Sequence, residues 1–302
     1  DGNRDIDLRG KDIVIRSRVM SWIDCESQPG DSHVGFLVIS GESEAARIEG
    51  FIIENAGLGS TSHDAGIIIS NISSPTIVNC TVLNSYIGIS CSATSNAKVA
   101  NCMFYSNHWG IIWGSHSRGT IVNTLVVNNA SHGMSFGHIG QPEVINCTIA
   151  DNGGYGLEFE ESSPVFRNCI IWGNQSGSIS GWIGEPEVSW SLVEGGYSGE
   201  GNKETDPLFA GSTSWDAYYL SQTASGQQEN SPCLNAGNAL ASEICFDTWS
   251  TTVCLDSLTT RTDEIPDTNM VDMGFHYSPF QASPPTPTPN VTPTPAFTAT
   301  PT

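Results

Sequence analysis

The segment "SPTIVNCTVLNS", residues 74–85, contains a phrase that the chain repeats four more times. The copies read "AKVANCMFYSN" at 97–107, "GTIVNTLVVNN" at 119–129, "PEVINCTIADN" at 142–152 and "PVFRNCIIWGN" at 164–174. Their shared asparagines recur every 22 or 23 residues, at Asn79, Asn101, Asn123, Asn146 and Asn168. An internal period of this length predicts a solenoid, in which each repeat forms one turn of a coil.

Within each repeat, apolar residues alternate with polar ones in three short runs, and residues that favour turns separate the runs. Alternation with period two indicates β-strands, and no helical spacing interrupts it. Three short parallel strands per turn of about 22 residues predict an all-β fold, a right-handed parallel β-helix. Its rungs should stack about 4.8 Å apart.

The repeated asparagine suits the corner between the first two strands, because asparagine tolerates left-handed backbone angles. Its amide can also bond to the asparagine of the next rung and so form a ladder. A second ladder is expected at Asn55, Ser85, Asn107, Asn129, Asn152 and Asn174. The residue after the first asparagine is always small, which suits a narrow core; this column holds Cys80, Cys102, Thr124, Cys147, Cys169 and Ser191.

The chain divides into three parts by composition. We expect the β-helix over residues 1–195, a C-terminal cap region over 196–281 and a Pro/Thr-rich linker or stalk over 282–302. Alternating proline and threonine favours an extended, solvated backbone that builds no core. Because the sequence opens directly in a strand pattern, we also expect a processed or truncated N-terminus.

Charge and cysteine content limit the environment of the protein. The chain carries 32 acidic and 11 basic residues, a formal net charge of −21, which argues against nucleic acid and anionic membranes as partners. No stretch is apolar enough to span a membrane. Nine cysteines cannot all pair, and the column suggests that most are buried thiols. Cys245 and Cys254 are candidates for a loop disulfide, with a zinc site as the weaker alternative.

Several phrases together resemble a known group of proteins. They are "GFIIENAG" at 50–57, the Asn-Cys rungs, "DPLF" at 206–209, "SPCLNAGN" at 231–238 and "DMGF" at 272–275. This combination is similar to secreted bacterial right-handed β-helix proteins of the pectate-lyase-like superfamily, closest to surface proteins that end in such a C-terminal module. The resemblance implies the fold and a location outside the cell or on its surface. It implies little about function, because the superfamily includes lyases, hydrolases, adhesins and structural proteins.

Catalytic residues are not evident. A lyase of this superfamily would need clustered acidic calcium ligands beside a basic residue, and Arg118 and Arg167 have no evident acidic trio near them. A hydrolase would need two carboxyl groups at a set separation. Asp151 with Glu158, or Glu158 with Glu160, could form such a pair, although solvated surface acids explain these residues more simply.

A metal site is a further alternative. His116, His138 and Glu160 are spaced 22 residues apart, so they should stack on one exterior turn. Imidazole and carboxylate groups suit a divalent metal. Otherwise the three are polar turn residues that align by chance, and no cofactor is expected.

Outward positions of the second strand form a largely apolar stripe that includes Tyr105 and Trp172. Such a stripe marks a partner. It could be covered by the C-terminal region, by another subunit, or by sugar rings stacked on the two aromatic residues. A second column of rings, Trp109, His132 and Tyr155, could likewise contact sugar or only shield a corner.

Glycosylation is possible at several positions. Asn71 and Asn290 are the best sequon acceptors, because the other sequons fall on expected ladder or corner residues. Thr286, Thr288, Thr292 and Thr294 in the tail suit O-glycosylation.

We therefore expect a non-enzymatic extracellular structural or adhesive protein. It could assemble into filaments by end-to-end stacking, because end rungs expose unpaired strand edges. The alternative is a β-helix protein that binds or degrades polysaccharide.

Overall fold

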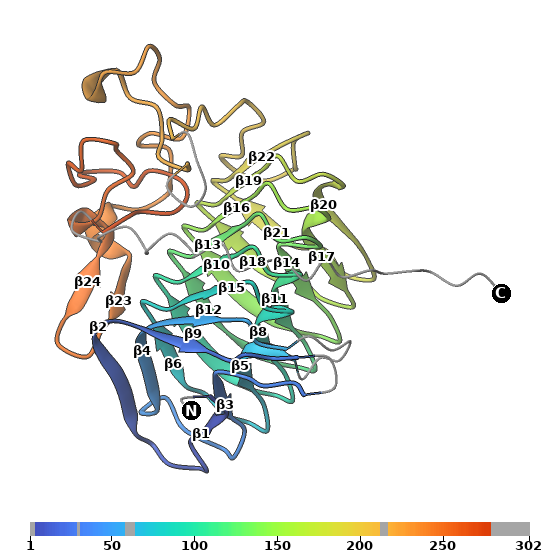
Figure 1. The fold of residues 1–302 in the computed structure, drawn as a ribbon. Coiled ribbons are helices and arrows are strands. Elements are labelled where there is room, and N and C mark those ends of the chain that lie inside the picture. Colours follow the sequence, from blue (N-terminus) through green and yellow to red (C-terminus); the bar gives the residue numbers. More distant parts are fainter. Residues whose placement is uncertain (1–3, 29–30, 58–63, 212–216, 279–302) are drawn as a thin grey trace.

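The computed structural model describes residues 4–28, 31–57, 64–211 and 217–278 of the chain. It is an all-β parallel solenoid, as the repeat predicted (Figure 1). Within the described ranges the helices are three single 3-10 turns, η2 (Thr223–Ser225), η3 (Ala241–Glu243) and η4 (Leu255–Ser257). None of these turns is long enough to cross a membrane.

Sheet A is formed by the third strand of each turn. Its eight parallel strands follow one another rung by rung, and each pairs with the strand of the next turn. In order they are β1 (Ile6–Asp7), β3 (Phe36–Val38), β5 (Ala65–Ile69), β8 (Ile87–Cys91), β11 (Trp109–Trp113), β14 (Met134–Phe136), β17 (Tyr155–Glu160) and β20 (Gly177–Trp182).

The first and second strands of each turn form two arms of a fourteen-stranded sheet. The arms meet at β4 (Arg47–Glu54), which pairs with β6 through its first half and with β7 through its second. Between the halves lies Gly50, whose φ of 83° is accessible to glycine without strain. The edge strand β2 (Val14–Asp24) pairs with β4 in the first complete rung.

The two arms are named here by their strands. Arm 1 holds β6 (Thr76–Val78), β9 (Asn96–Ala100), β12 (Arg118–Val122), β15 (Gln141–Ile145), β18 (Val165–Arg167) and β21 (Glu187–Ser189). Arm 2 holds β7 (Thr81–Leu83), β10 (Met103–Tyr105), β13 (Leu125–Val127), β16 (Thr148–Ala150), β19 (Ile170–Trp172) and β22 (Leu192–Val193).

The core contains the residues that the period-two pattern placed inside. Each rung contributes one apolar side chain from arm 1, one from arm 2 and two from sheet A, and Phe104, Trp113 and Phe166 are fully buried. A glycine at the start of the sheet A strands from β3 to β17 also faces this core. A Cβ on Gly110 would lie 2.4 Å from the carbonyl oxygen of Gly133 and 2.5 Å from Cγ1 of Val126. These contacts explain why the column holds glycine from Gly35 to Gly156, while the last strand, β20, has Ser178 at this position.

The first asparagine column forms the predicted corner, because all five residues have φ between 46° and 56°. Amide Nδ2 groups donate to Oδ1 of the rung below from Asn101 to Asn79 at 2.8 Å, from Asn123 to Asn101 at 2.9 Å and from Asn168 to Asn146 at 3.1 Å. This confirms the ladder, except at the step between Asn123 and Asn146, where the C-terminal region binds both residues.

The second ladder is also formed, and it is buried from Ser85 to Asn174. Asn55 was wrongly included in it. Ala56 occupies the ladder position, since its backbone N–H donates to Oγ of Ser85. Asn55 lies one residue earlier and binds Asp24 at the first rung.

The small-residue column is buried and consists of thiols and hydroxyls without disulfides. Each thiol donates to a carbonyl two residues earlier, as Cys102 does to Ala100 and Cys147 to Ile145. Thr124 and Ser191 make the same bond through oxygen. Burial raises the pKa of Cys102 and Cys147 well above the usual value, and neighbouring column thiols add to this. Seven of the nine cysteines are free and buried.

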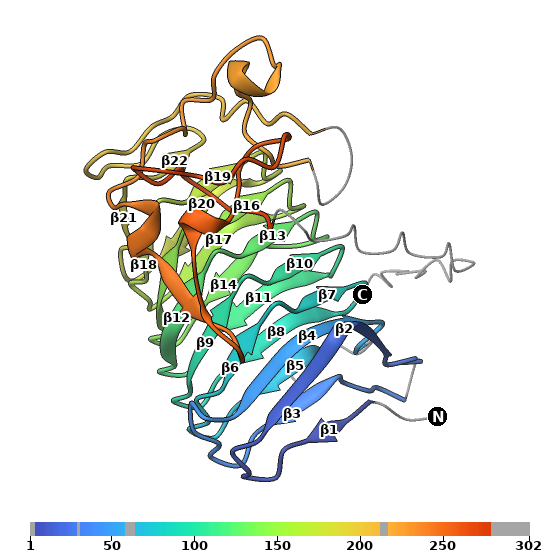
Figure 2. The ribbon, with the colours of Figure 1, turned by 90° about the vertical axis from the view of Figure 1, so that its left-hand side faces the viewer.

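After β22 the chain loses the period and folds over the outside of the arms (Figures 1 and 2). Tyr218, Phe275 and Tyr277 pack on outward residues of arm 2, and Leu255 and Leu258 pack against Val78 and Ala100 at the corner of arm 1.

A disulfide joins Cys245 to Cys254, the pair expected from the sequence. It closes the hairpin of β23 (Cys245–Asp247) and β24 (Thr252–Cys254). The hairpin descends beside the arms to the first rungs (Figure 1). There Arg47 donates to the carbonyl of Asp247, and the backbone N–H of Trp249 donates to Glu49 at 2.8 Å.

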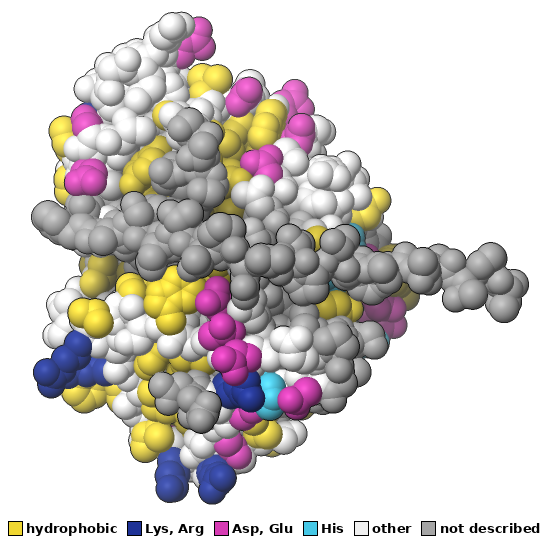
Figure 3. All heavy atoms as spheres, viewed as in Figure 1, with side chains coloured by type: hydrophobic (Ala, Val, Ile, Leu, Met, Phe, Trp, Pro, Cys, Tyr) yellow, Lys and Arg dark blue, Asp and Glu magenta, His cyan; other side chains and the backbone are white. Residues whose placement is uncertain are grey.

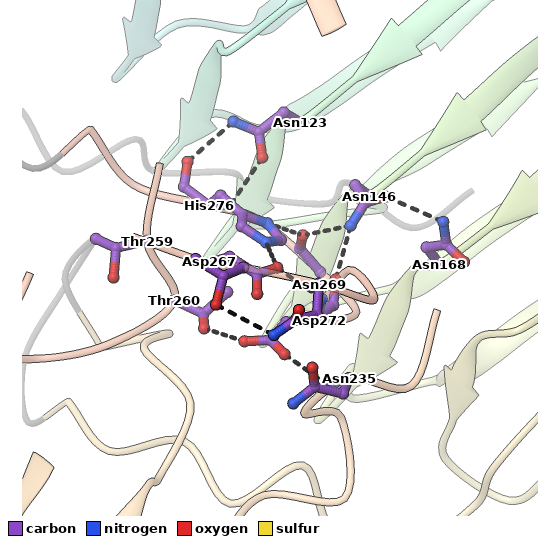
Figure 4. Close-up of polar contacts among 12 residues, drawn as sticks. Asn123, Asn146, Asn168, Asn235, Thr259, Thr260, Asp267, Asn269, Asp272 and His276 are labelled. Carbon is purple, nitrogen blue, oxygen red and sulfur yellow. Dashed lines mark hydrogen bonds and ion pairs between the residues drawn. The ribbon is translucent and has the colours of Figure 1, made fainter. Parts of the chain in front are cut away.

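The segment from Asp272 to His276 binds the first asparagine ladder (Figure 4). His276 is fully buried, and its Nε2 lies 2.9 Å from Oδ2 of Asp267, while its Nδ1 faces the carbonyl of Gly274. Asp272 accepts hydrogen bonds from Thr260 and from the backbone of Asn235. Burial raises the pKa of Asp272, and Asp267 raises it further. This polar cluster joins the C-terminal region to the coil.

Candidate carbohydrate-binding face on sheet A

The outer surface of the last strands of sheet A brings together aromatic, carboxylate and hydroxyl side chains. In β17, Leu157 and Phe159 point into the core, so Glu158 and Glu160 point outward. In β20 the alternation places Ser180 and Trp182 outside. The register sets Ser180 beside Glu158 and Trp182 beside Glu160. We name the outward residues Tyr155, Glu158, Glu160, Ser180 and Trp182 the β20 track.

Glu158 is held by two neighbours from the preceding rung. Nε2 of His132 lies 3.6 Å from Oε2 of Glu158, and Oγ of Ser135 donates to the same oxygen at 3.4 Å. Nδ1 of His132 accepts the backbone N–H of Tyr155 at 2.7 Å. The proton of the neutral ring therefore sits on Nε2 and faces the carboxylate. Among the described residues, Oε1 of Glu158 has no hydrogen-bond partner, so it is free to accept from a ligand.

The expected ring column exists and extends further than predicted. The centroids of Tyr86 and His108 are 5.0 Å apart, those of Trp109 and His132 are 4.8 Å apart, and those of His132 and Tyr155 are 5.6 Å apart. His108 connects the two parts by an edge contact with Trp109. Burial lowers the pKa of His108, and the nearby His132 adds to this effect.

This self-stacking limits which rings can receive a ligand. His132 has Trp109 on one side and Tyr155 on the other, so its faces are occupied. Tyr155 is the last ring of this column among the described residues, because the next rung places Gly177 beside it. A Cβ built on Gly177 would lie only 3.6 Å from Cε1 of Tyr155. Tyr155 is half-buried, and the glycine backbone lies beside its ring.

The stacking on which the metal alternative depended is wrong. The steps from Ile111 to Met134 and from Met134 to Leu157 are each 23 residues, so a 22-residue spacing falls out of register. His116 has the same left-handed turn conformation as Ile139, and His138 matches Glu161. His116, His138 and Glu160 therefore do not stack. In the described ranges no group of three His, Cys, Asp or Glu side chains is arranged to hold a metal.

Of the two carboxylate pairs considered, the structure places one on a common face. Asp151 lies on the turn after β16, and its Oδ2 accepts the hydroxyl of Tyr218 at 2.9 Å. Burial raises the pKa of Tyr218, and the charge of Asp151 raises it further. Asp151 thus binds the C-terminal region at arm 2, whereas Glu158 and Glu160 share the outside of β17.

The C-terminal region packs on both Tyr105 and Trp172, the two aromatic residues of the apolar stripe. Tyr105 is only 8% exposed and packs with Tyr218, Phe275 and Tyr277. Trp172 is half-buried against Leu220 and its neighbours. The C-terminal region therefore covers the apolar stripe, as one of the three alternatives proposed.

The acceptor Asn71 is exposed on a turn, although its amide donates to the carbonyl of Ile39 at 2.9 Å. The other glycosylation candidates, Asn290, Thr286, Thr288, Thr292 and Thr294, lie outside the described residues.

Sequence reasoning missed the contact of His132 with Glu158 and the roles of Gly177 and Trp182. The signal was present in "GSISGW", residues 177–182, where Ile179 faces inward and Trp182 outward. The strand had no aligned copy of the Asn-Cys phrase, so the alternation was not extended to it.

Comparisons with known proteins concern the fold. The family model described as a right-handed β-helix region matches residues 35–189, just over half of the chain. Among solved structures, the chain is similar to pectate lyase Pel9A, with 12% identity, a TM-score of 0.44, and coverage of 84% of this chain and 78% of that one.

A second solved structure is the A-module of the mannuronan C-5 epimerase AlgE4 of Azotobacter vinelandii. It shows 9% identity, a TM-score of 0.26, and coverage of 63% and 80%. No curated protein matches. The parallel rungs and the matched family model together show that the chain belongs to the right-handed β-helix family.

Proposed function

We propose that this protein is an extracellular adhesive β-helix protein that binds polysaccharide on the β20 track without cleaving it. The observation that carries the proposal is Trp182, which is 54% exposed and paired in register with the outward Glu160. Sugars present apolar ring faces and hydroxyl groups. Aromatic side chains can stack on the apolar ring faces, and carboxylates can accept hydrogen bonds from the hydroxyl groups.

The placement of the two carboxylates favours binding over hydrolysis. Glu158 and Glu160 are two residues apart on one strand, so their Cα atoms are separated by about 7 Å and both approach a ligand from the same side. A glycosidase instead needs carboxyl groups that flank the scissile bond. Side by side, the two groups suit hydrogen bonds to successive sugar hydroxyls.

The disulfide supports a location outside the cell. Cys245 is exposed on its hairpin, and such bonds persist mainly in oxidising compartments. The Pro/Thr-rich segment 282–302 lies outside the described residues, and we propose that it serves as a linker.

Glycan-array binding tests the proposal. We expect wild-type protein to bind at least one polysaccharide, and Trp182→Ala to weaken that binding at least tenfold. Trp249→Ala is the matched control, because this tryptophan is similarly exposed, at 51%, but lies on the β23–β24 hairpin. Equal losses in both variants, or no glycan binding by folded wild type, would contradict the proposal. Product formation that stops in Glu158→Gln would show an enzyme instead.

Self-association is a second candidate, and the strand edges at the first rung favour it. Among the described strands, β1 pairs only with β3, and β2 pairs only with β4. Val19 in β2 is 76% exposed. The opposite end is covered, since the segment around Tyr197 packs on the core and Trp190 bonds to Glu200. This arrangement suits two copies joined by their first rungs better than an end-to-end filament.

The test of self-association is electron microscopy and light scattering over a concentration series. Paired rods that become single in Val19→Lys would support it. Isolated rods at every concentration would exclude it, and long filaments would show that the covered end also opens.

A further inference from the structure

We infer that the β20 track selects uncharged oligosaccharide segments and excludes uronate and sulfated polymers. This inference rests on the proposed binding function and adds the chemical class of the ligand. It follows from the charges around the track, the hydrogen-bonding capacity of its side chains and the distance between its platforms.

The strands of sheet A carry no basic side chain of the lysine or arginine type. Beside the track, Glu161 and Glu185 are exposed on the turn that follows sheet A. On the face seen in Figure 3, basic side chains gather mainly around the first rungs, whereas acidic ones reach the upper rungs.

The basic residues of the neighbouring rungs belong to other faces. Arg167 lies on β18 of arm 1 and is paired with Glu143. Lys203 lies beside Leu192 of arm 2, and its Nζ donates to the carbonyl of Pro232 at 2.7 Å. A polyanion on the β20 track would therefore meet Glu158 and Glu160 without compensating charge, and like charges at close range repel.

A neutral sugar is not repelled by these carboxylates. Its hydroxyl groups can donate to the carboxylates of Glu158 and Glu160, and such charge-assisted hydrogen bonds are stronger than neutral ones. Because His132 and Ser135 both bind Oε2 of Glu158, the carboxylate is already oriented before a ligand arrives. Binding then costs little side-chain entropy.

The platforms also set a minimum ligand length and a direction. Tyr155 and Glu160 are five residues apart on β17, which corresponds to about 16 Å along the strand. Trp182 stands beside Glu160, and the half-buried ring of Tyr155 lies beside Gly177 at the other end of β20. A ligand that uses both platforms must follow the strand, and it must contain several sugar rings.

The experiment measures binding of the full chain to neutral gluco-, manno- and xylo-hexasaccharides and to oligogalacturonate of equal length, at low and high salt. We expect the tightest neutral ligand to bind at least tenfold more strongly than oligogalacturonate. This difference in affinity should narrow in high salt, because screening weakens the repulsion between the carboxylates and oligogalacturonate. It should also narrow in the double variant Glu158→Gln, Glu160→Gln. Glu187→Gln is the matched control, since Glu187 is exposed on β21 of arm 1.

The outcomes separate the two proposals. If oligogalacturonate binds as tightly as the neutral ligands and Trp182→Ala abolishes that binding, the track is a glycan site but the inference about charge is wrong. If binding of every glycan survives Trp182→Ala, the proposed function itself fails. A neutral trisaccharide that binds as tightly as the hexasaccharide would overturn the inferred length.

Discussion

Asn123 and Asn146 occupy adjacent rungs of the first amide ladder, yet the side chains of both form hydrogen bonds with the C-terminal segment. Nδ2 of Asn123 donates to the carbonyl of His276 at 2.9 Å, and its Oδ1 accepts the N–H of His276 at 2.7 Å. Nδ2 of Asn146 donates to the carbonyl of Asp272 at 2.8 Å. The step at which the ladder is interrupted is thus the step at which the C-terminal region attaches (Figure 4).

The first prediction concerns this attachment. Asn146→Ala should release the segment 272–277, because the buried carbonyl of Asp272 loses its donor, at a cost of about 1–3 kcal/mol. Hydrogen exchange of the Phe275 and Tyr277 amides measures it. Asn101→Ala is the control, since Asn101 has nearly the same φ but bonds only within the ladder. Equal exchange at these amides in both variants would contradict the attachment.

The glycine column yields a second prediction. Gly110→Ala should destabilise the coil by about 3 kcal/mol or prevent folding, because the new Cβ would overlap the next rung. Gly137→Ala should change stability by less than about 1 kcal/mol, since a Cβ there meets nothing within 4 Å. Urea unfolding of the two variants compares them. Similar unfolding midpoints for the two variants would contradict the prediction and show that neighbouring rungs can move apart to admit the Cβ.

A third prediction concerns Glu42, which is 1% exposed. Burial alone would raise its pKa. Hydrogen bonds from the backbone N–H groups of Ser40 and Gly10 and from the hydroxyl of Ser73 nevertheless hold the pKa below the usual 4.5. A lowered folded pKa contributes stability above the unfolded value, and that contribution is lost as the pH falls through the folded pKa.

Glu42→Gln should therefore lower the free energy of unfolding by about 1–3 kcal/mol at neutral pH, and the difference from wild type should shrink in acid. Denaturant titrations at both pH values check this. Asp272 has a raised pKa, so its own contribution is lost as the pH rises through that value. Because wild type and variant both contain Asp272, this opposing effect cancels in the difference between their free energies of unfolding. A difference that does not change with pH would disprove the charged role of Glu42.

The fourth prediction is redox dependence of the β23–β24 hairpin. The disulfide closes a loop with a sequence separation of 9 residues, and a loop of this size contributes about 2–3 kcal/mol in the chain-entropy treatment. Reduction should loosen the hairpin and increase hydrogen exchange at Trp249, whose N–H binds Glu49. The double variant Cys245→Ser, Cys254→Ser should exchange rapidly with or without reductant. A response to reductant in that variant would contradict the assignment of the redox effect to this disulfide.

The last prediction tests the small-residue column. Cys147→Ser should cost less than about 1.5 kcal/mol, because a hydroxyl can make the bond to the carbonyl of Ile145 that Thr124 makes to Val122. Cys147→Val should cost more, since it removes the donor and adds volume to a filled core. Thermal unfolding of the two variants decides between them. A valine variant as stable as the serine variant would show that neither the hydrogen bond nor the small volume selects the residues of this column.

Much of the coil could be read from particular residues. The asparagine and cysteine columns, the inward residues of all three strands and the Cys245–Cys254 pair were recognisable, because a solenoid repeats the same local environment at a fixed interval. The metal column failed for the same reason. One extra residue in each of two turns moved His116 and His138 out of register, and spacing alone did not show where the extra residues lay.

The sequence by itself determined the parallel rungs, their corners and their narrow core, since these depend on alternation and on residues that tolerate left-handed angles. Only the tertiary structure decided what lies on the outside of the rungs. The C-terminal region buries Tyr105, while Trp182 on β20 stays exposed. Outward side chains are not constrained by the repeat, because their environment comes from distant segments that pack against them.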